Sequence, residues 1–445
     1  MKIIRSSART KKVWEEIAYR DCGEFDRDAP TVVVDTSQKF QTHCGFGGAL
    51  TESTGAALSK ATEKDRRRVL ENYYSKEGLN YNLGRISVHS NDFSLGNYTY
   101  VSAEDRELST FSLERDERFV LPLVREALSI RKLELLSSAW SPPAWMKTNG
   151  DMNYGGRLRK DCYGVWADYY VRFLLELRKQ GIEVSMLTAQ NEPEAVQLWD
   201  SCNFTAEEEA DFLENHLIPR LDENGLGNVK ILIWDHNRDR VVRRASVTLA
   251  GEKLRKRVWG VGYHWYVSCE HGNLSALHAL FPEKHILLTE SSVELTNAAE
   301  QGSEQASGKW EHAERYARQM IHDFNNFSEG WIDWNMVLDE EGGPNHVSNF
   351  CDAHVTVNGK TGEVTYNPSF YYVGHFSRYI LPGARRMLCL NDEEKDLHTC
   401  AYENPDGSRV AVILNTDWVK KIAFIADGKG CNITLPPRSI VTVLF

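Results

Sequence analysis

Two glutamates that each follow an apolar run are the best candidates for acid–base chemistry in this sequence. Glu192 comes shortly after residues 184–189, and Pro193 behind it cannot continue a strand ladder and restricts the backbone of Glu192. Glu290 comes directly after residues 285–289. Two carboxylates facing one sugar can share the roles of nucleophile, general acid and general base. Most of the 63 acidic residues should be solvated surface groups, so it is the strand-end position that favours a catalytic role for this pair.

The segments around these glutamates alternate between strand and helix patterns. Before Glu192, apolar side chains recur at helical spacing from Val165 to Leu177, and Gly181 stands where such a helix would end. The first strand-like run ends in the glycine-rich residues 45–52, and seven more occupy residues 85–88, 133–137, 184–189, 229–234, 259–263, 285–289 and 330–334. Eight strands with helices between them predict an α/β fold, a (β/α)8 TIM barrel.

Polar or aromatic side chains follow nearly every one of these strands. In chain order they are Asn91 and Asp92, Trp140, Asn191 and Glu192, Asp235 to Asn237, His264 to Tyr266, Glu290, and Asn335. The C-terminal strand ends of such a barrel meet at one face, which is where its active sites lie. We therefore expect one shared pocket, with the two glutamates contributed by the fourth and seventh strands.

The chain changes to a purely β pattern after about Pro382. Strand-like runs occupy residues 387–390, 399–402, 409–414, 421–425 and 440–445, and residues 404–407 have the composition of a hairpin turn. Residues 12–19 and 31–34 near the N-terminus also look like strands that no helix follows. We predict an all-β sandwich built from both chain ends, with residues 1–40 and 382–445 beside a catalytic barrel of residues 41–381.

Composition and charge argue against several classes of function. The net charge is −11 with both signs interspersed, so nucleic acid is a poor partner. The nine cysteines form no C-x-x-C pair and there is no H-E-x-x-H motif, so we predict no metal and no other cofactor. No apolar run reaches membrane-spanning length, and the N-terminus lacks the apolar stretch of a signal peptide. We expect a cytoplasmic protein, or one exported without a cleavable signal peptide.

Several motifs in series give the chain a resemblance to a known family. They are Gly45-Phe46-Gly47-Gly48-Ala49-Leu50-Thr51, Asn91-Asp92-Phe93-Ser94, Trp140 with Trp145-Met146-Lys147-Thr148-Asn149-Gly150, Asn191-Glu192-Pro193, His264-Trp265-Tyr266, Thr289-Glu290, and Gly330-Trp331 through Asn345. Together they resemble glycoside hydrolase family 30, and within it the glucosylceramidase branch. The resemblance covers essentially the whole chain in the right order, and the chain looks like a bacterial member.

The resemblance implies roles for the residues nearest the reacting bond. Glu192 would be the general acid/base and Glu290 the nucleophile of a retaining mechanism, a choice that sequence spacing leaves open because it cannot give the distance between the carboxylates. Asn191 would hold the sugar 2-hydroxyl, and Tyr266 would orient Glu290. Arg85 would lie beneath the pocket as a charge partner for carboxylates, although a purely structural ion pair explains a strand arginine equally well.

The remaining predicted binding residues surround the sugar ring. By resemblance, Asp92, Trp140 and Trp334 would bind the outer hydroxyls and stack on the ring, while Asn237 and Asn345 would line the pocket rim. The two tryptophans could instead be core packing. His264, outside this set, is expected to be a hydrogen-bonded scaffold residue and not a metal ligand.

The resemblance implies a retaining exo-β-glycosidase that acts on glucosylceramide or a simpler β-glucoside, with transient contact to a lipid surface. β-Xylosidase and β-1,6-glucanase are the alternatives, because loop changes alter the substrate on one scaffold. A glycan-binding protein without turnover would require the loss of a carboxylate, and both are present. The chain departs from the motifs of the lysosomal members of this branch at residues 235–237 and at His346. Both positions are near the expected aglycone side, so the resemblance does not identify the leaving group.

Overall fold

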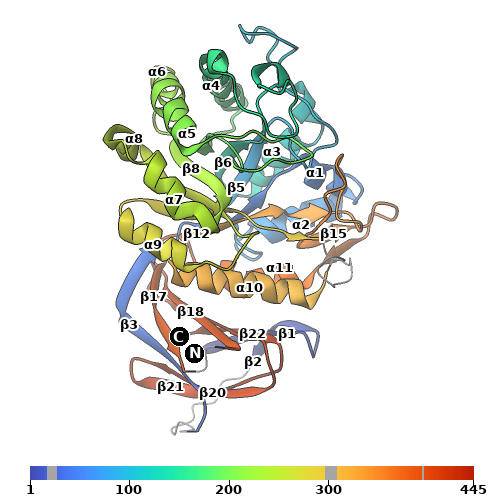
Figure 1. The fold of residues 1–445 in the computed structure, drawn as a ribbon. Coiled ribbons are helices and arrows are strands. Elements are labelled where there is room, and N and C mark those ends of the chain that lie inside the picture. The colour runs from blue at the N-terminus through green and yellow to red at the C-terminus, as the bar shows by residue number, and fades with distance from the viewer. Residues whose placement is uncertain (18–27, 296–307, 393–394) are drawn as a thin grey trace.

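The computed structural model describes residues 1–17, 28–295, 308–392 and 395–445 of the chain. It has two parts, a closed barrel surrounded by helices and a nine-stranded sheet that holds both chain termini (Figure 1). Among the described residues, no helix combines the length and the apolar character needed to cross a membrane.

The barrel consists of eight parallel strands, which confirms the predicted (β/α)8 fold. In chain order they are β4 (Gly45–Ala49), β5 (Leu83–Val88), β6 (Glu134–Ala139), β7 (Val184–Thr188), β8 (Lys230–Asn237), β9 (Val258–His264), β10 (His285–Glu290) and β12 (Gly330–Asn335), and β12 pairs with β4 to close the ring. Leu83, Leu136, Met186, Leu232, Leu287 and Ile332 form an apolar cluster contributed by six of these strands. The glycine-rich β4 is needed for closure, because a side chain at Gly47 would collide with the backbone of Leu83.

Helices surround the barrel in the order that the alternating pattern predicts. They are α1 (Glu52–Leu58), α2 (Glu63–Tyr74), α3 (Val120–Ile130), α4 (Tyr163–Lys179), α5 (Ala206–Phe212), α6 (Ile218–Glu223), α7 (Val241–Thr248), α8 (Glu252–Arg257), α9 (Gly272–Leu280), α10 (Trp310–Asn325) and α11 (Pro368–Ser377). On α4 the residues at helical spacing, including Trp166 and Tyr170, are buried, except for the partly buried Val165. The chain leaves this helix through Gly181, whose φ of 76° is left-handed and suits glycine.

Several strand ends at the barrel mouth depart from regular pairing or backbone geometry, among them β12, whose register with β4 shifts between Asp333 and Asn335. The register shifts between Trp234 and His236 where β8 pairs with β9, and between Leu288 and Glu290 where β10 pairs with β9. Trp234 has φ of 75°, and Glu192, just beyond β7, has φ of 45°. Such irregularities re-aim side chains, and left-handed backbone at a non-glycine residue persists only where its surroundings hold it.

The second part is one sheet to which both ends of the chain contribute. Its strand order is β2-β1-β22-β19-β18-β17-β3-β20-β21, formed by β1 (Lys2–Ser7), β2 (Lys12–Ile17), β3 (Thr31–Thr42), β17 (Arg385–Asn391), β18 (Leu397–Glu403), β19 (Arg409–Asn415), β20 (Lys420–Ala426), β21 (Lys429–Leu435) and β22 (Ser439–Leu444). The seven strands predicted here are present, while β1 and β21 were not predicted. Residues 18 and 19 of the first predicted strand lie outside the described residues.

The barrel and the sheet meet along α10 and α11 (Figure 1). His375 of α11 is buried between the Ser6 and Thr442 hydroxyls, at 2.8 Å from each, so it links the first and last parts of the chain. Arg438 donates two hydrogen bonds to Glu314 of α10, at 2.8 and 2.9 Å. Short strands complete the loops at the barrel mouth: β11 (Val293–Glu294) with β14 (Cys351–Asp352), and β13 (Val337–Leu338) with β15 (Val355–Val357) and β16 (Val364–Tyr366).

Candidate active site

A cavity of about 590 Å³ lies at the C-terminal ends of the barrel strands. Its lining residues are Asp92, Trp140, Asn191, Glu192, Ala195, Gln197, Leu198, Trp199, His236, Asn237, Tyr266, Val267, Glu290, Glu294, Trp334, Val347, Ser348, Asn349 and Cys351. A second cavity, of about 640 Å³, lies at the opposite end of the barrel beside Lys230 and Trp259. Only the first gathers the predicted carboxylates, and it lies at the face where such barrels do their chemistry.

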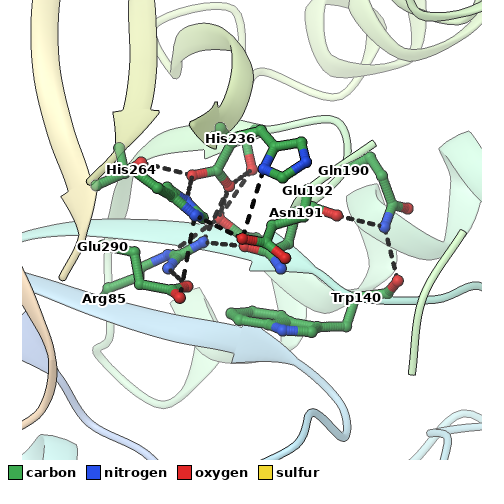
Figure 2. Close-up of polar contacts among 12 residues, drawn as sticks. Arg85, Trp140, Gln190, Asn191, Glu192, His236, His264 and Glu290 are labelled. Atoms are coloured by element: carbon green, nitrogen blue, oxygen red, sulfur yellow. Dashed lines mark hydrogen bonds and ion pairs between the residues drawn. The ribbon is translucent and has the colours of Figure 1, made fainter. Parts of the chain in front are cut away.

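Glu192 is held by the next two strands of the barrel, β8 and β9. Its backbone N–H donates to the carbonyl of Asp235, 2.9 Å away. Its side chain is 15% exposed, and its Oε1 lies 3.1 Å from His264 Nδ1 and 3.5 Å from His236 Nδ1 (Figure 2). Burial alone would raise the pKa of Glu192, but the charge and hydrogen bonds of the two imidazoles outweigh burial and lower that pKa.

Glu290 ends β10 with both carboxylate oxygens engaged. Arg85 donates from Nη1 to Oε2, and the Tyr266 hydroxyl donates to Oε1 over 2.9 Å. His264 Nδ1 lies 4.0 Å from the same Oε1. Burial and the neighbouring charge of Glu290 hold the pKa of Tyr266 well above its ordinary value, so its hydroxyl remains a donor. These two donors fix the position of the Glu290 side chain.

Arg85 and Asp235 form a fully buried layer beneath the cavity. Arg85 Nη2 lies 3.0 Å from Asp235 Oδ2 and donates to Asn191 Oδ1 over 2.8 Å. Burial opposes both charges, but Arg85 lowers the pKa of Asp235 and the carboxylates raise the pKa of Arg85. A buried ion pair of this kind is costly unless its remaining hydrogen bonds are made. Thr289 meets this requirement in part, because its hydroxyl donates to Asp235 Oδ1 over 2.6 Å.

His264 connects this buried layer to the cavity. Its Nε2 lies 3.0 Å from Asp235 Oδ1, and its Nδ1 faces Glu192. Burial would lower the pKa of His264, but the charge of Glu290 and the hydrogen bonds to Asp235 and Glu192 raise it to about 9. These shifts favour the proton on the imidazole of His264 over the carboxyl group of Glu192.

The far wall of the cavity combines two tryptophans with a buried carboxyl group. Trp140 and Trp334 stack with ring centroids 5.0 Å apart, and the Arg85 guanidinium lies 4.8 Å from the Trp140 ring centre. Asp92 is buried, and Asn349 donates to its Oδ2 over 2.9 Å. Burial, followed by the charge of Glu290, raises the pKa of Asp92 well above its ordinary value. A group of this kind can exchange hydrogen bonds with sugar hydroxyls.

The structure brings nine of the ten predicted site residues together. Asp92, Trp140, Asn191, Glu192, Asn237, Tyr266, Glu290 and Trp334 line the cavity, and Arg85 lies beneath it as expected. Asn345 does not line the cavity, in contrast to the prediction. Its amide donates to the carbonyl of Asn349 and its Oδ1 accepts from the Asn349 and Val347 N–H groups, so it shapes the loop that presents Asn349.

Several residues at the cavity were not predicted to belong to it. His236 and Glu294 add a second imidazole and a fourth carboxyl group, while Trp199 and Asn349 add wall and hydrogen-bonding surface. Burial raises the pKa of Glu294. His264 was expected to be a scaffold histidine, and its contact with Asp235 fits that expectation, but its second nitrogen reaches Glu192. The polar run Asp235-His236-Asn237 at a strand end was the only local signal for His236.

Comparison with known families accounts for both parts of the chain. The glycosyl hydrolase family 30 TIM-barrel domain matches residues 43–380, and the glycosyl hydrolase family 30 beta sandwich domain matches residues 383–443. The chain belongs to glycoside hydrolase family 30. This membership shows that the protein is a glycosidase, as the two strand-end glutamates and the family resemblance predicted.

Proteins with two different named specificities are similar to this chain. Lysosomal acid glucosylceramidase of Mus musculus is 36% identical over 398 residues, which cover 85% of this chain and 76% of the mouse protein. The crystal structure of SrfJ from Salmonella typhimurium has a TM-score of 0.93 at 37% identity and covers 100% of this chain and 99% of SrfJ. A solved endo-β1,6-glucanase has a TM-score of 0.88 at 26% identity and covers 100% of this chain and 98% of its own.

Proposed function

We propose that this family 30 enzyme is a retaining exo-β-glycosidase that removes a terminal β-glucosyl residue from glucosylceramide or a related β-glucoside. The observation that carries the proposal is the position of Glu192 and Glu290 around one nitrogen. Their Oε1 atoms lie 3.1 and 4.0 Å from His264 Nδ1, so the two oxygens are at most about 7 Å apart. A separation within this bound accommodates the roughly 5–5.5 Å between the two carboxyl groups of retaining enzymes.

The reaction would proceed by two displacements at the anomeric carbon. Glu290 attacks this carbon while Glu192 gives a proton to the departing oxygen, and a glycosyl ester forms on Glu290. Glu192, now a carboxylate, takes a proton from water, and the water oxygen displaces Glu290 to release a β-sugar. Arg85 and Tyr266 hold the nucleophile in place, and Asn191, which accepts a hydrogen bond from Arg85, would bind the sugar 2-hydroxyl.

The proton for the first step would come from the imidazole next to Glu192. The raised pKa of His264 and the lowered pKa of Glu192 favour His264 as the group that holds this proton before the reaction. The 3.1 Å contact between Nδ1 and Oε1 provides a direct route from the imidazole to Glu192 as the leaving oxygen approaches. Asp235 keeps the His264 ring oriented during this transfer, since it accepts from the other ring nitrogen.

The closed wall of the cavity favours one terminal sugar in the glycone site. Asp92, Trp140 and Trp334 form this wall, and Asn349 holds the Asp92 carboxyl group in place. Buried polar groups that are arranged to pair a sugar's outer hydroxyls cost free energy when they remain unpaired. An epimer with a misdirected hydroxyl should therefore react more slowly than glucose.

The rim of the cavity favours an apolar aglycone. Leu198 and Val267 line the opening and are each 66% exposed, and Val196, at 63%, stands between the lining residues Ala195 and Gln197. Large apolar side chains grouped at a binding site mark a surface for an apolar partner. A ceramide could cover them at a micelle or bilayer surface, and the similarity to mouse glucosylceramidase supports this choice.

Rates on four substrates test the proposed specificity. We expect hydrolysis of an aryl β-glucoside and of glucosylceramide in mixed micelles. The aryl β-galactoside should be about 10²-fold slower in kcat/KM, because its axial 4-hydroxyl misdirects the Asp92 contacts. The β-xyloside should be about tenfold slower, because it lacks only the hydroxymethyl group. Initial rates with each substrate provide the measurement.

One variant at the cavity rim distinguishes recognition of the lipid part of the substrate from recognition of its sugar. Leu198→Ser should lower kcat/KM for micellar glucosylceramide by about tenfold and leave the aryl β-glucoside unchanged, because only the lipid reaches this exposed side chain. Cleavage confined to internal bonds of a β-1,6-glucan would contradict the proposal. That result would favour the glucanase alternative, which the 26% identical solved endo-β1,6-glucanase supports.

A further inference from the structure

Glu192, His236 and His264 form a cluster that the glycosidase mechanism does not fully explain. They come from the ends of β7, β8 and β9, which are neighbours in the barrel. One metal-ligating atom from each residue lies within 4.8 Å of the other two, and among the described residues this is the only such group of three or more. Figure 2 shows the two imidazoles on either side of the Glu192 carboxylate.

The spacing of these atoms suits a tetrahedral ion. Zinc–nitrogen and zinc–oxygen bonds of about 2.0–2.2 Å place two tetrahedral ligand atoms about 3.3 Å apart. Glu192 Oε1 lies 3.1 Å from His264 Nδ1 and 3.5 Å from His236 Nδ1, so two of the three separations already match. The third separation, between the two imidazole nitrogens, is within 4.8 Å and must shorten on binding, which would cost His236 its 3.3 Å contact with the Asn237 amide.

The surroundings of His264 provide a second, independent feature of metal sites. A histidine ligand generally has its other nitrogen bound to a carboxylate, which fixes the ring and increases its basicity. His264 Nε2 lies 3.0 Å from Asp235 Oδ1, and Thr188 and Ser138 donate to Asp235 Oδ2 over 2.7 and 2.8 Å. The ring is therefore held so that Nδ1 points at Glu192 and the cavity.

We propose that this cluster is a binding site for a divalent zinc-like cation, and that the bound ion inhibits the enzyme by occupying the acid/base carboxylate. Two neutral histidines and one glutamate are a common ligand set for zinc in sites that keep a fourth position open, so binding would displace the proton of His264. Glu192 and His236 line the cavity, so the ion has both an entry path and an open side. The inhibition, but not the binding, rests on the proposed function.

Calorimetric titration of the full chain with zinc chloride tests the binding directly. We expect one zinc per chain in the wild type, and at least tenfold weaker binding in His236→Ala and in Glu192→Gln, each of which removes a ligand atom. His285→Ala is the matched control, because His285 lies at the opposite end of the barrel beside Glu329 and should leave the affinity unchanged. Circular dichroism verifies that each variant is folded.

Activity measurements separate the two parts of the proposal. Zinc should inhibit aryl β-glucoside hydrolysis with a midpoint equal to its calorimetric dissociation constant, and a chelator should restore the rate. Absence of binding by the wild type, or equal affinity in wild type and His236→Ala, would overturn the site. If zinc binds but leaves the rate of aryl β-glucoside hydrolysis unchanged, the proposed inhibition is refuted. A chain that binds zinc yet hydrolyses no glycoside would refute the proposed function and leave the site standing.

Discussion

Glu290→Gln should lower kcat/KM for an aryl β-glucoside by roughly 10⁴-fold or more while the fold is retained. An amide cannot attack the anomeric carbon, so the glycosyl ester does not form. The shape of the side chain is kept, and Arg85 remains balanced by Asp235 at 3.0 Å, so the buried layer should tolerate the change. Initial rates at saturating and limiting substrate, together with a thermal melt, measure both effects.

The matched control for this variant is Glu329→Gln, which makes the same chemical change at the other end of the barrel. Glu329 is partly buried and pairs with His285, so it tests the cost of a lost carboxylate away from the cavity. We expect the control to stay within about threefold of wild type. A Glu290→Gln enzyme that keeps a tenth of the wild-type rate would contradict the assignment of Glu290 as nucleophile.

Glu192→Ala should lower the rate by about 10²–10⁴-fold on glucosylceramide, whose alkoxide leaving group needs a proton. The acidic phenol of an aryl glucoside departs without that proton, so the first step with this substrate should be far less affected. The second step remains slow, because no base activates water. Comparison of kcat/KM for the two substrates measures this difference, which removal of a merely structural residue would not produce.

Azide provides the decisive control for Glu192→Ala. The missing side chain leaves space beside the glycosyl ester, and azide needs no base to attack it. We expect azide to raise the rate of the variant on the aryl glucoside and to leave the wild type unaffected, with β-glucosyl azide as the product. An α-glucosyl azide, or no rate increase, would argue against Glu192 as the acid/base.

The barrel was predictable because each of its strands is a local signal. Apolar runs that end in polar residues and alternate with helical segments depend on short stretches of chain. The strands β1 and β21 were missed for the opposite reason: the apolar content of β1 is confined to Ile3 and Ile4, and β21 begins with Lys429 and a glycine. Their place in the sheet comes from pairing with distant segments, as β1 does with β22.

The two glutamates were also predictable, because each one follows an apolar run that the sequence shows directly. The positions of the other site residues depend on local backbone geometry, which cannot be predicted from residue spacing. His236 approaches Glu192 because the register shifts between Trp234 and His236, next to a left-handed backbone. Asn349 takes the place expected for Asn345, because the Asn345 amide is used within its own loop.

The most direct test of the central claim is the anomer first released from an aryl β-glucoside, followed by proton NMR in the first minutes of the reaction. Double displacement through Glu290 predicts β-glucose as the first product, with α-glucose appearing later by mutarotation. The same experiment with glucosylceramide should give the same order. Release of α-glucose first would mean that water attacks directly, and would contradict the role of Glu290 as a covalent nucleophile.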